Sequence, residues 1–148
     1  MGLMVQVKRS FGTFTLDADW SIGNELAVLF GYSGAGKTLT LQMIAGLVRP
    51  DAGSIRLDGR ALFDQDAPVD LAPQKRPFGY VFQDLALFPH MTVKANILYG
   101  ARGIDRDERE RRSRDMIARF RLSGLEHAFP AMISGGQKQR VALARALI

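Results

Sequence analysis

The glycine-rich stretch GYSGAGKT at residues 31–38 constrains the fold of this chain more than any other feature. It follows a short apolar run at 26–30 and precedes a segment whose apolar residues recur with helical spacing. A loop of the form G-x-x-x-x-G-K-[ST] between a strand and a helix is a cradle for phosphate groups. Its glycines let successive backbone N–H groups converge on one anion, and the dipole of the following helix points at the same place. We therefore predict a nucleoside triphosphate site at this loop.

Two side chains of the loop have predicted roles of their own. Lys37 supplies a mobile cation for the outer phosphates, and Thr38 supplies a hydroxyl for Mg²⁺. The competing interpretation is a glycine-rich turn that caps an ordinary strand–helix unit. The predicted nucleotide-binding residues of the loop are Gly31, Tyr32, Ser33, Gly34, Ala35, Gly36, Lys37 and Thr38.

The base of the nucleotide is expected to stack on an aromatic ring, because every base has a π face. Phe11, in the turn at 10–12, is the candidate platform, with Phe14 or Trp20 behind it. Packing in the hydrophobic core is the competing interpretation for all three rings.

Composition restricts the class of protein. The chain has 148 residues, of which 47% are hydrophobic and 24% charged, as in ordinary globular domains. No apolar run approaches the length that spans a bilayer, and the N-terminus has no signal-peptide pattern, so we expect a soluble protein. The absence of cysteine excludes disulfides, thiolate metal sites and thiol catalysis.

The net charge of +5 does not by itself indicate a nucleic-acid partner. Much of the basic charge lies at 102–115, where acidic residues are interleaved with it. An i,i+4 spacing of opposite charges favours a solvated helix face over a surface that follows phosphates. The pairs with this spacing are Asp107 with Arg111, Glu108 with Arg112, and Glu110 with Arg114.

The order of the predicted elements indicates an α/β fold. The apolar run 26–30 suits a strand that is covered on both faces, as in a parallel sheet. A helix after Gly36 would place Leu39, Met43, Ile44 and Leu47 on one face. The other predicted strands are 5–7, 14–18, one within 49–59, and 78–84; the predicted helices are 92–99, 106–121 and 136–148; and 64–77 is predicted as an exposed loop.

The segment ISGGQKQRVALARAL, at 133–147, resembles the signature of ATP-binding-cassette (ABC) ATPases, whose usual form is Leu-Ser-Gly-Gly-Gln followed by a basic helix. Ile133 stands where that family normally has Leu. Gln83, in FGYVFQD, matches the family's Q-loop glutamine, and 87–100 is similar to the importer branch. The resemblance spans nearly the whole chain and implies a P-loop ATPase core with an N-terminal β-rich lobe and a helical subdomain.

The resemblance also implies ligands and roles. ATP and Mg²⁺ would be bound, with Thr38 and Gln83 as the metal-binding residues and Gln83 as the catalytic one. Gln83 would contact Mg²⁺ or the attacking water and sense the membrane partner; the competing interpretation is a solvent-facing residue at the end of a strand. His90 and His127 lack a second ligand at a useful spacing, so neither is a metal candidate. His90 is expected on the surface that meets the transporter.

The signature would form a second phosphate-binding helix N-terminus. In the family, this surface closes over the ATP that is bound in the opposite subunit of a head-to-tail homodimer. The residues that carry this role to the present chain are Ser134, Gly135, Gly136 and Gln137.

The resemblance predicts three regions: 1–86 as the β lobe and P-loop core, 87–135 as the helical subdomain with the signature, and 136–148 as the start of a return helix. The family's Walker B strand and its later histidine loop would lie beyond Ile148. We therefore expect an N-terminal fragment, truncated before the Walker B strand, that does not hydrolyse ATP by itself. We also expect marginal stability or self-association, with part of the cover lost from the helix face of Val141, Ala144 and Ile148.

The function implied for the whole protein is that of the ATP-hydrolysing subunit of an importer, at the cytoplasmic face of the cell membrane. Its partners would be a transmembrane permease subunit and, indirectly, a solute-binding protein; no nucleic acid is expected. The pattern is most similar to molybdate importers, although sulfate, polyamine and sugar importers share much of it. One alternative is a nucleic-acid-associated cassette ATPase, against which the short separation of Lys37 and Ser134 argues, since it leaves no room for a long coiled coil. The other alternative is a non-hydrolysing ATP-binding module.

Overall fold

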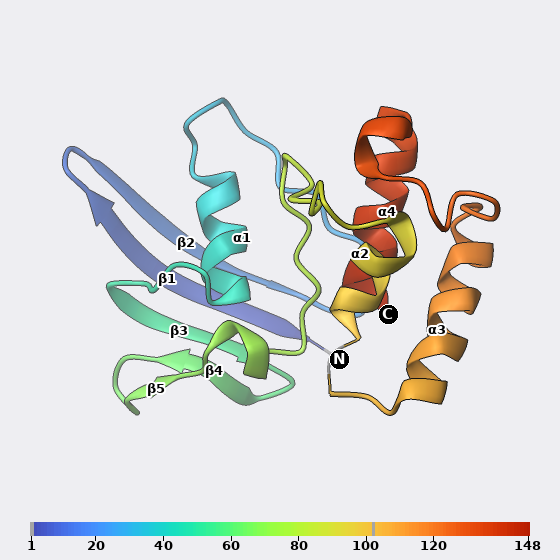
Figure 1. Ribbon diagram of the computed structural model, residues 1–148. Coiled ribbons are helices and arrows are strands. Elements are labelled where there is room, and N and C mark those ends of the chain that lie inside the picture. The colour runs from blue at the N-terminus through green and yellow to red at the C-terminus, as the bar shows by residue number, and fades with distance from the viewer. Residues whose placement is uncertain (1, 102) are drawn as a thin grey trace. The chain divides into compact units, whose positions relative to one another are not determined.

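The computed structural model describes residues 2–101 and 103–148. The chain forms two compact units, Met1–Phe78 and Gly79–Ile148 (Figure 1). The first unit contains a sheet and helix α1 (Lys37–Ala45), and the second is built from helices.

The sheet of the first unit is antiparallel throughout. Its strand order is β2-β1-β3-β4-β5, so the hairpin of β1 and β2 adds to a meander of β3, β4 and β5. Strands β1 and β3 approach closely at Gly53, where φ is +96° and a Cβ would overlap the carbonyl of Gln6. The strands are β1 (Leu3–Phe11), β2 (Phe14–Ile22), β3 (Ala52–Leu57), β4 (Arg60–Asp64) and β5 (Val69–Asp70).

The core of the first unit lies between the sheet and helix α1 (Lys37–Ala45), which covers one face of the sheet (Figure 1). Apolar and polar residues alternate along β1, so that Val5 and Val7 face the core and are buried, while Gln6 and Lys8 are exposed. Each fully buried aliphatic side chain contributes about 1.5–3 kcal/mol relative to an exposed one. The buried members of this core are Val5, Val7, Leu16, Met43, Ile44, Ile55, Leu62 and Phe63.

Two of the predicted strands do not form. Segment 26–30 has no strand structure, and the exposed fractions of Leu26, Val28 and Phe30 are 92%, 80% and 99%. Segment 78–84 runs as coil into a turn. A buried strand needs hydrogen-bonding neighbours for its N–H and C=O groups, and neither segment pairs with any strand of the described residues. The prediction was wrong because an apolar run indicates burial but does not show that a neighbouring strand is available to pair with it.

The predicted loop 64–77 contains more structure than expected. It includes the short strand β5 and a 3₁₀ turn, η1 (Pro73–Lys75). Pairing of β5 with β4 places Asp70 opposite Phe63.

In the second unit, the predicted helices are confirmed. They are α2 (Val93–Gly100), α3 (Arg106–Arg119) and α4 (Gly135–Leu147), with a 3₁₀ turn, η2 (Pro130–Met132), before α4. Each helix begins at a side-chain cap, which satisfies N–H groups that have no partner within the helix. Thr92 accepts from the N–H of Ala95, Asp105 accepts from two N–H groups, and Ser134 caps α4.

The core of the second unit corrects the expectation for helix 136–148. Val141 and Ala144 are fully buried, and Ile148 packs against the same cluster. The exposed apolar side chains of α4 are instead Leu143 and Leu147. The cover comes from the unit itself: the buried members of this core are Val93, Ile97, Ile117, Leu122, Ile133, Val141 and Ala144.

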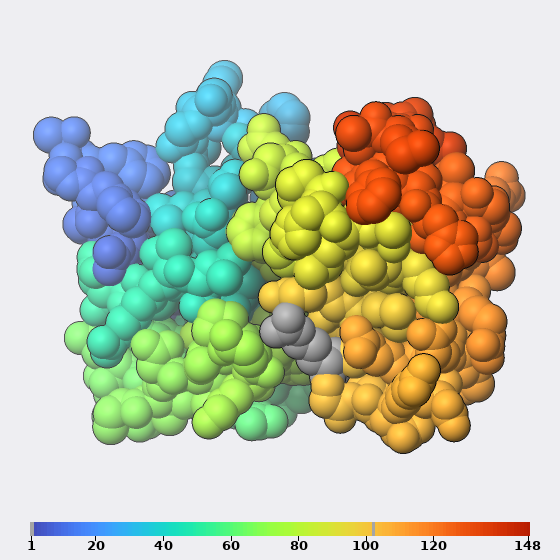
Figure 2. Space-filling view, viewed as in Figure 1, coloured from blue at the N-terminus to red at the C-terminus, as the bar shows by residue number. Residues whose placement is uncertain are grey.

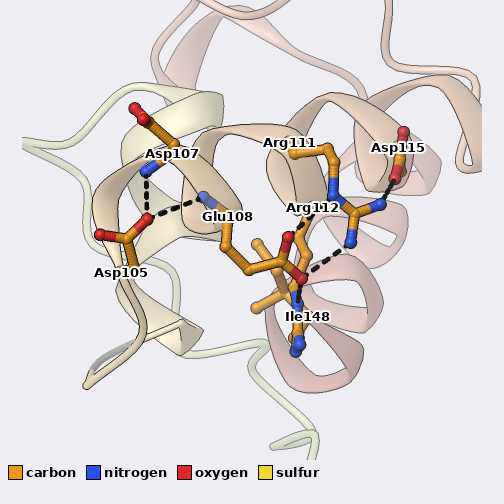
Figure 3. A network of polar contacts seen from close by, with 7 residues as sticks. All are labelled: Asp105, Asp107, Glu108, Arg111, Arg112, Asp115 and Ile148. Carbon is orange, nitrogen blue, oxygen red and sulfur yellow. Dashed lines mark hydrogen bonds and ion pairs between the residues drawn. The ribbon is translucent and has the colours of Figure 1, made fainter.

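Helix α3 carries a charged network on its surface (Figure 3). The predicted pair Glu108–Arg112 forms at 2.7 Å. Arg111 bonds Glu108 and Asp115 rather than Asp107, at 2.8 and 3.3 Å. Hydrogen bonds from Arg111 and then Arg112 lower the pKa of Glu108 to about 2. The run at 102–115 therefore contains a charged helix face whose acids and bases bond to one another.

Glu110, the acid of the third predicted pair, bonds Lys94 in α2 at 2.7 Å. The charged face of α3 is thus tied to a neighbouring helix of the same unit. Packing of α2 and α3 in one apolar cluster brings these two side chains together, a contact that helical spacing alone does not predict.

Candidate functional site

The glycine-rich loop adopts the backbone conformation that its sequence predicts at two positions. Gly34 and Gly36 have φ values of 87° and 84°, in the left-handed region that side chains disfavour. At Gly36 there is also no room, since a Cβ would lie 2.6 Å from Cδ1 of Leu16 in β2. The end of the loop therefore rests directly on the sheet. Figure 2 shows the loop, in light blue, standing out from the surface of the first unit.

The N-terminus of α1 has N–H groups to offer an anion. The first intrahelical bond runs from the N–H of Thr40 to the carbonyl of Gly36, at 2.8 Å, so the N–H groups of Lys37, Thr38 and Leu39 precede it. Gly36, the N-cap, has no side chain to accept from them, and the first turn contains no acidic residue. Helix α1 therefore begins with free donors and an uncompensated positive dipole end, which fits a phosphate group.

Lys37 lies over the loop. Its Nζ donates to the carbonyls of Gly31 and Tyr32, at 2.7 Å each. An ammonium group has three protons, so a third remains for another acceptor. The side chain of Thr38 is exposed at the start of the helix, whereas that of Thr40 is buried and its hydroxyl donates to the carbonyl of Gly36. The loop thus presents the ammonium of Lys37 and the exposed hydroxyl of Thr38 at the helix N-terminus.

The candidate rings for the base lie at the tip of the first hairpin and beyond it. Phe11 and Phe14 are paired across that tip, with exposed fractions of 44% and 39%. The Arg9 guanidinium covers the ring of Phe11, 4.9 Å from its centre. The ring of Phe14 comes within 3.4 Å of the Cβ position at Gly36, so it is the aromatic ring that lies beside the loop. Trp20 packs against the core cluster of the first unit.

The signature segment lies in the second unit and forms a capping box. The Oγ of Ser134 accepts from the N–H of Gln137 at 3.2 Å, and the Oε1 of Gln137 accepts from the N–H of Ser134 at 2.7 Å. Gly135 and Gly136 are exposed, and nothing lies within 4 Å of either Cβ position. This helix N-terminus is therefore held rigid by its two polar side chains and open at its two glycines. Ile133 is 6% exposed and belongs to the core, where the change from Leu is accommodated.

Gln83 also lies in the second unit, in a turn rather than at the end of a strand. The N–H of Leu85 donates to the carbonyl of Phe82 at 2.9 Å and closes this turn. Gln83 itself is exposed. Two residues of the same turn, Leu85 and Ala86, have φ values of 63° and 43°, which are uncommon for residues with side chains.

Beside this turn lies an open groove of about 320 Å³. The segment after Gln83 forms one wall, and η2 together with the first turns of α4 forms the other. His90 is exposed nearby, with its ring 6.1 Å from that of Phe88. Residues that line the groove include Asp84, Leu85, Leu87, Pro89, Ala131 and Lys138.

Three side chains that support these features were missed by the sequence analysis: Arg76 and Asn96 are buried, and Arg145 is half-buried. Arg145 donates to the carbonyls of Ala86 and Leu85, at 2.7 and 2.8 Å. Asn96, fully buried, accepts from the N–H of Phe88 and donates to carbonyls of the segment 88–92. Arg76 donates to the carbonyls that end α1. Their partners are main-chain atoms, which leave no pattern in the sequence.

A metal ion would find few ligands among the protein's own side chains. Within the described residues, no group of three or more His, Asp or Glu side chains is placed to hold one. Mg²⁺ often takes one or two protein oxygens and completes its octahedron with phosphate and water. The exposed hydroxyl of Thr38 could serve as one such protein oxygen. The described residues do not form a metal site made of protein ligands alone.

A phosphate loop on an exposed helix N-terminus, with a second glycine-opened helix in the same chain, defines a P-loop nucleotide-binding protein of the cassette class. The family model described as "ABC transporter" matches residues 18–148, and the chain belongs to this family.

Two relatives within the family are import ATP-binding proteins by name. The chain is 45% identical over 148 residues to the molybdate/tungstate import ATP-binding protein WtpC of Archaeoglobus fulgidus, covering all of this chain and 59% of the relative. It is 45% identical over 146 residues to the molybdenum import ATP-binding protein ModC of Rhodospirillum rubrum, covering 99% of this chain and 40% of that relative. The chain thus spans about half the length of the curated relatives it matches.

A solved structure supports the fold. "Dimeric Structure of MJ0796, a Bacterial ABC Transporter Cassette" matches with a TM-score of 0.74 and 27% identity, covering 99% of this chain and 69% of the other. The predicted α/β cassette fold with an N-terminal β-rich part and a helical part is therefore confirmed, although the strands at 26–30 and 78–84 are not formed. No described helix has the length and apolar character needed to cross a membrane.

Proposed function

We propose that this chain provides the ATP-binding part of the ATPase subunit of an ABC importer, which energises uptake of molybdate or a similar oxyanion. The observation that carries the proposal is the start of α1. There, free N–H groups, the ammonium of Lys37 and the hydroxyl of Thr38 converge on one exposed surface of the first unit.

ATP supplies the phosphate groups, and its bound Mg²⁺ supplies charge neutralisation when present. In this proposal Lys37 exchanges its bonds to the carbonyls of Gly31 and Tyr32 for bonds to the outer phosphate oxygens. The backbone N–H groups of the loop bind the inner phosphates, and the hydroxyl of Thr38 binds the metal. Phe11 or Phe14 stacks on the base; Phe14 lies beside the loop, and Phe11 has one face covered by Arg9.

The signature has a role in a dimer. We expect Gly135 and Gly136 to offer N–H groups to a phosphate bound by a second subunit, because they are open and belong to a helix N-terminus. The Oγ of Ser134 already accepts one bond, and its own proton remains free to donate to a phosphate oxygen. Gln137 acts on this site by fixing the cap. The ABC transporter cassette MJ0796, which shares the fold of this chain and was solved as a dimer, supports this part of the proposal.

The partner in the membrane is proposed from the groove beside Gln83. A permease segment would dock there, against Leu85, Leu87 and the exposed His90 region. Gln83, at the edge of that segment, would report docking to the nucleotide by contacting Mg²⁺ or the attacking water. The proposed location is accordingly the cytoplasmic face of the membrane, and the link to a solute-binding protein is indirect, through the permease.

Hydrolysis and transport are proposed for the whole protein. Two alternatives predict different results. A non-hydrolysing module binds ATP but gives no hydrolysis in the complete protein with its permease. A nucleic-acid-associated ATPase binds DNA with an affinity that falls steeply as salt rises.

Calorimetry of Mg-ATP binding tests the proposal at its centre. Lys37→Ala removes charge-assisted bonds and should weaken binding about 10- to 150-fold. Lys75→Ala, at an exposed lysine of the first unit, is the control and should change affinity less than about twofold. Equal affinities for wild type and Lys37→Ala would contradict the proposed site.

The solute is tested in the complete transporter. Uptake of radioactive molybdate by cells should require both ATP and Lys37, and tungstate should compete for it. Uptake of a sugar or polyamine that depends on Lys37, with no molybdate uptake, would retain the importer function and reject the oxyanion.

A further inference from the structure

We propose that Arg145 is a positioning residue that locks the turn after Gln83 to the signature helix, so that the two elements move as one body. This inference rests on the proposed function, in which Gln83 and the signature both act on nucleotide. Its structural part concerns contacts within the second unit alone.

The lock consists of two hydrogen bonds to consecutive carbonyls. Nη1 of Arg145 donates to Ala86 at 2.7 Å, and Nη2 donates to Leu85 at 2.8 Å. The guanidinium also lies 5.5 Å from the centre of the Phe88 ring. Arg145 belongs to α4, the helix that Ser134 caps, so one rigid element carries both the signature and the lock.

The turn needs such a lock because of its backbone. Leu85 and Ala86 both lie in the left-handed region, with φ values of 63° and 43°. Residues with side chains stay there only when their surroundings determine the conformation, and such residues concentrate at functional sites. The two donors of Arg145 meet the carbonyls of these same two residues, which identifies the guanidinium as the group that holds the conformation.

The far end of the same segment is held independently. Asn96 of α2 binds both the N–H and the carbonyl of Phe88, at 2.9 and 3.1 Å. The segment between Gln83 and Phe88 is therefore fixed at Phe88 by α2, and at Leu85 and Ala86 by α4. A displacement of α4 that left Gln83 behind would break both bonds of Arg145.

Arginine is required by the geometry. Its planar guanidinium donates two parallel bonds from one fixed fork, whereas a lysine ammonium is a single point with a flexible stem. Arg145→Lys keeps the positive charge and loses the fork, which makes it the informative variant. Arg140→Lys makes the same change on the same helix, at a side chain whose Nε has no hydrogen-bond partner among the described residues, and is the matched control.

Hydrogen exchange of backbone amides tests the lock directly. With Arg145→Lys, amides of residues 83–88 should exchange about 10- to 100-fold faster, and those of α3 and of Val141–Ala144 should change less than about threefold. Arg140→Lys should leave residues 83–88 unchanged. Faster exchange throughout the second unit would mean that Arg145 stabilises the whole unit and not this turn in particular. Unchanged exchange at residues 83–88 would mean that Arg145 does not hold the turn. Either result overturns the proposal.

The functional arm compares ATP affinity with and without Mg²⁺. Mg²⁺ should increase the affinity for ATP, and Gln83→Ala should reduce this increase. Arg145→Lys should reduce the increase by a similar factor. The double variant should lose no more of the increase than Gln83→Ala does. Binding of ATP without Mg²⁺ should be unchanged in all three variants, because the phosphate loop retains its residues. A normal Mg²⁺-dependent increase in Arg145→Lys, beside a reduced increase in Gln83→Ala, overturns the positioning role. No effect of Gln83→Ala would instead contradict the role proposed for Gln83, and the exchange result would then decide the lock.

Discussion

The Nη1 atom of Arg76 lies 2.8 Å from the main-chain carbonyl oxygen of Met43. It also donates to Ile44 at 2.9 Å, and Nε donates to Leu71 at 2.8 Å. The side chain of Arg76 is 1% exposed, and burial lowers its pKa while the Asp70 carboxylate partly restores it. The guanidinium thus satisfies carbonyls at the C-terminus of α1, where a cation is favoured by the helix dipole. The same helix begins at the phosphate loop.

Arg76→Met should reduce the free energy of unfolding by about 2–4 kcal/mol, because it removes the buried hydrogen bonds from the guanidinium to the carbonyls of Met43 and Ile44. Chemical denaturation monitored by the single tryptophan, Trp20, reports on this unit. Arg49→Met is the control: Arg49 pairs with the same Asp70 at 3.5 Å but is 72% exposed, so its loss should cost less than about 1 kcal/mol. Similar losses in the two variants would contradict the role assigned to Arg76.

Asn96→Asp should destabilise the second unit by about 2–4 kcal/mol at neutral pH. The substitution keeps the shape of the side chain but replaces the Nδ2 donor, which bonds the carbonyls of Phe88, Met91 and Thr92, with an acceptor. Gln139→Glu makes the same chemical change at an exposed position of α4 and should have an effect below about 0.5 kcal/mol. Thermal unfolding followed by circular dichroism compares them, and a small effect of Asn96→Asp would show that this clip is dispensable.

We expect Glu108 to make part of the free energy of unfolding sensitive to acid. Its pKa is lowered from 4.5 to about 2 in the folded chain, so its contribution is fully present above about pH 4.5 and is lost as the pH falls toward 2. Glu108→Gln should flatten the stability profile between these pH values and leave its shape above pH 5 unchanged. Denaturation midpoints measured from pH 2 to 7 check this. A profile that Glu108→Gln does not alter below pH 4.5 would mean that its bonds to Arg111 and Arg112 do not contribute.

Gly36→Ala should weaken both the first unit and its binding of ATP. The alanine would have to adopt φ near 84° and would place its Cβ 2.6 Å from Leu16, so we expect a loss of about 2–4 kcal/mol. Gly59→Ala separates the two causes, since Gly59 has φ of +78° but nothing within 4 Å, and should lose about 1–2 kcal/mol. Equal losses would show that backbone conformation alone matters at Gly36.

The exposed run at 26–30 should promote self-association, because backbone groups that pair with no described strand and apolar side chains lie together on the surface. Val28→Lys should lower the tendency to associate in sedimentation velocity experiments over a range of concentrations, with circular dichroism unchanged. Met4→Lys is the control, since Met4 is 52% exposed but belongs to a paired strand. Wild type that stays monomeric at high concentration would contradict the prediction.

Local patterns in the sequence determined several parts of this protein. The glycines at 34 and 36, the capping sequence that begins at Ser134, and the helical spacing of apolar residues in α1 and α4 act through neighbours a few positions away. Such short-range features depend on backbone conformation and on first-turn hydrogen bonds, so they can be recognised without the fold.

Only the tertiary structure decided what depends on distant partners. The apolar run 26–30 predicts a strand, yet strand formation requires a second chain segment that offers N–H and C=O groups in register. Val141 and Ala144 are buried because they pack in one cluster with side chains of α2 and of other segments of the second unit. Arg76, Asn96 and Arg145 act on main-chain carbonyls, and Arg76 and Arg145 reach residues far away in the chain. Every residue type carries a carbonyl, so the sequence does not mark which ones these side chains will bind.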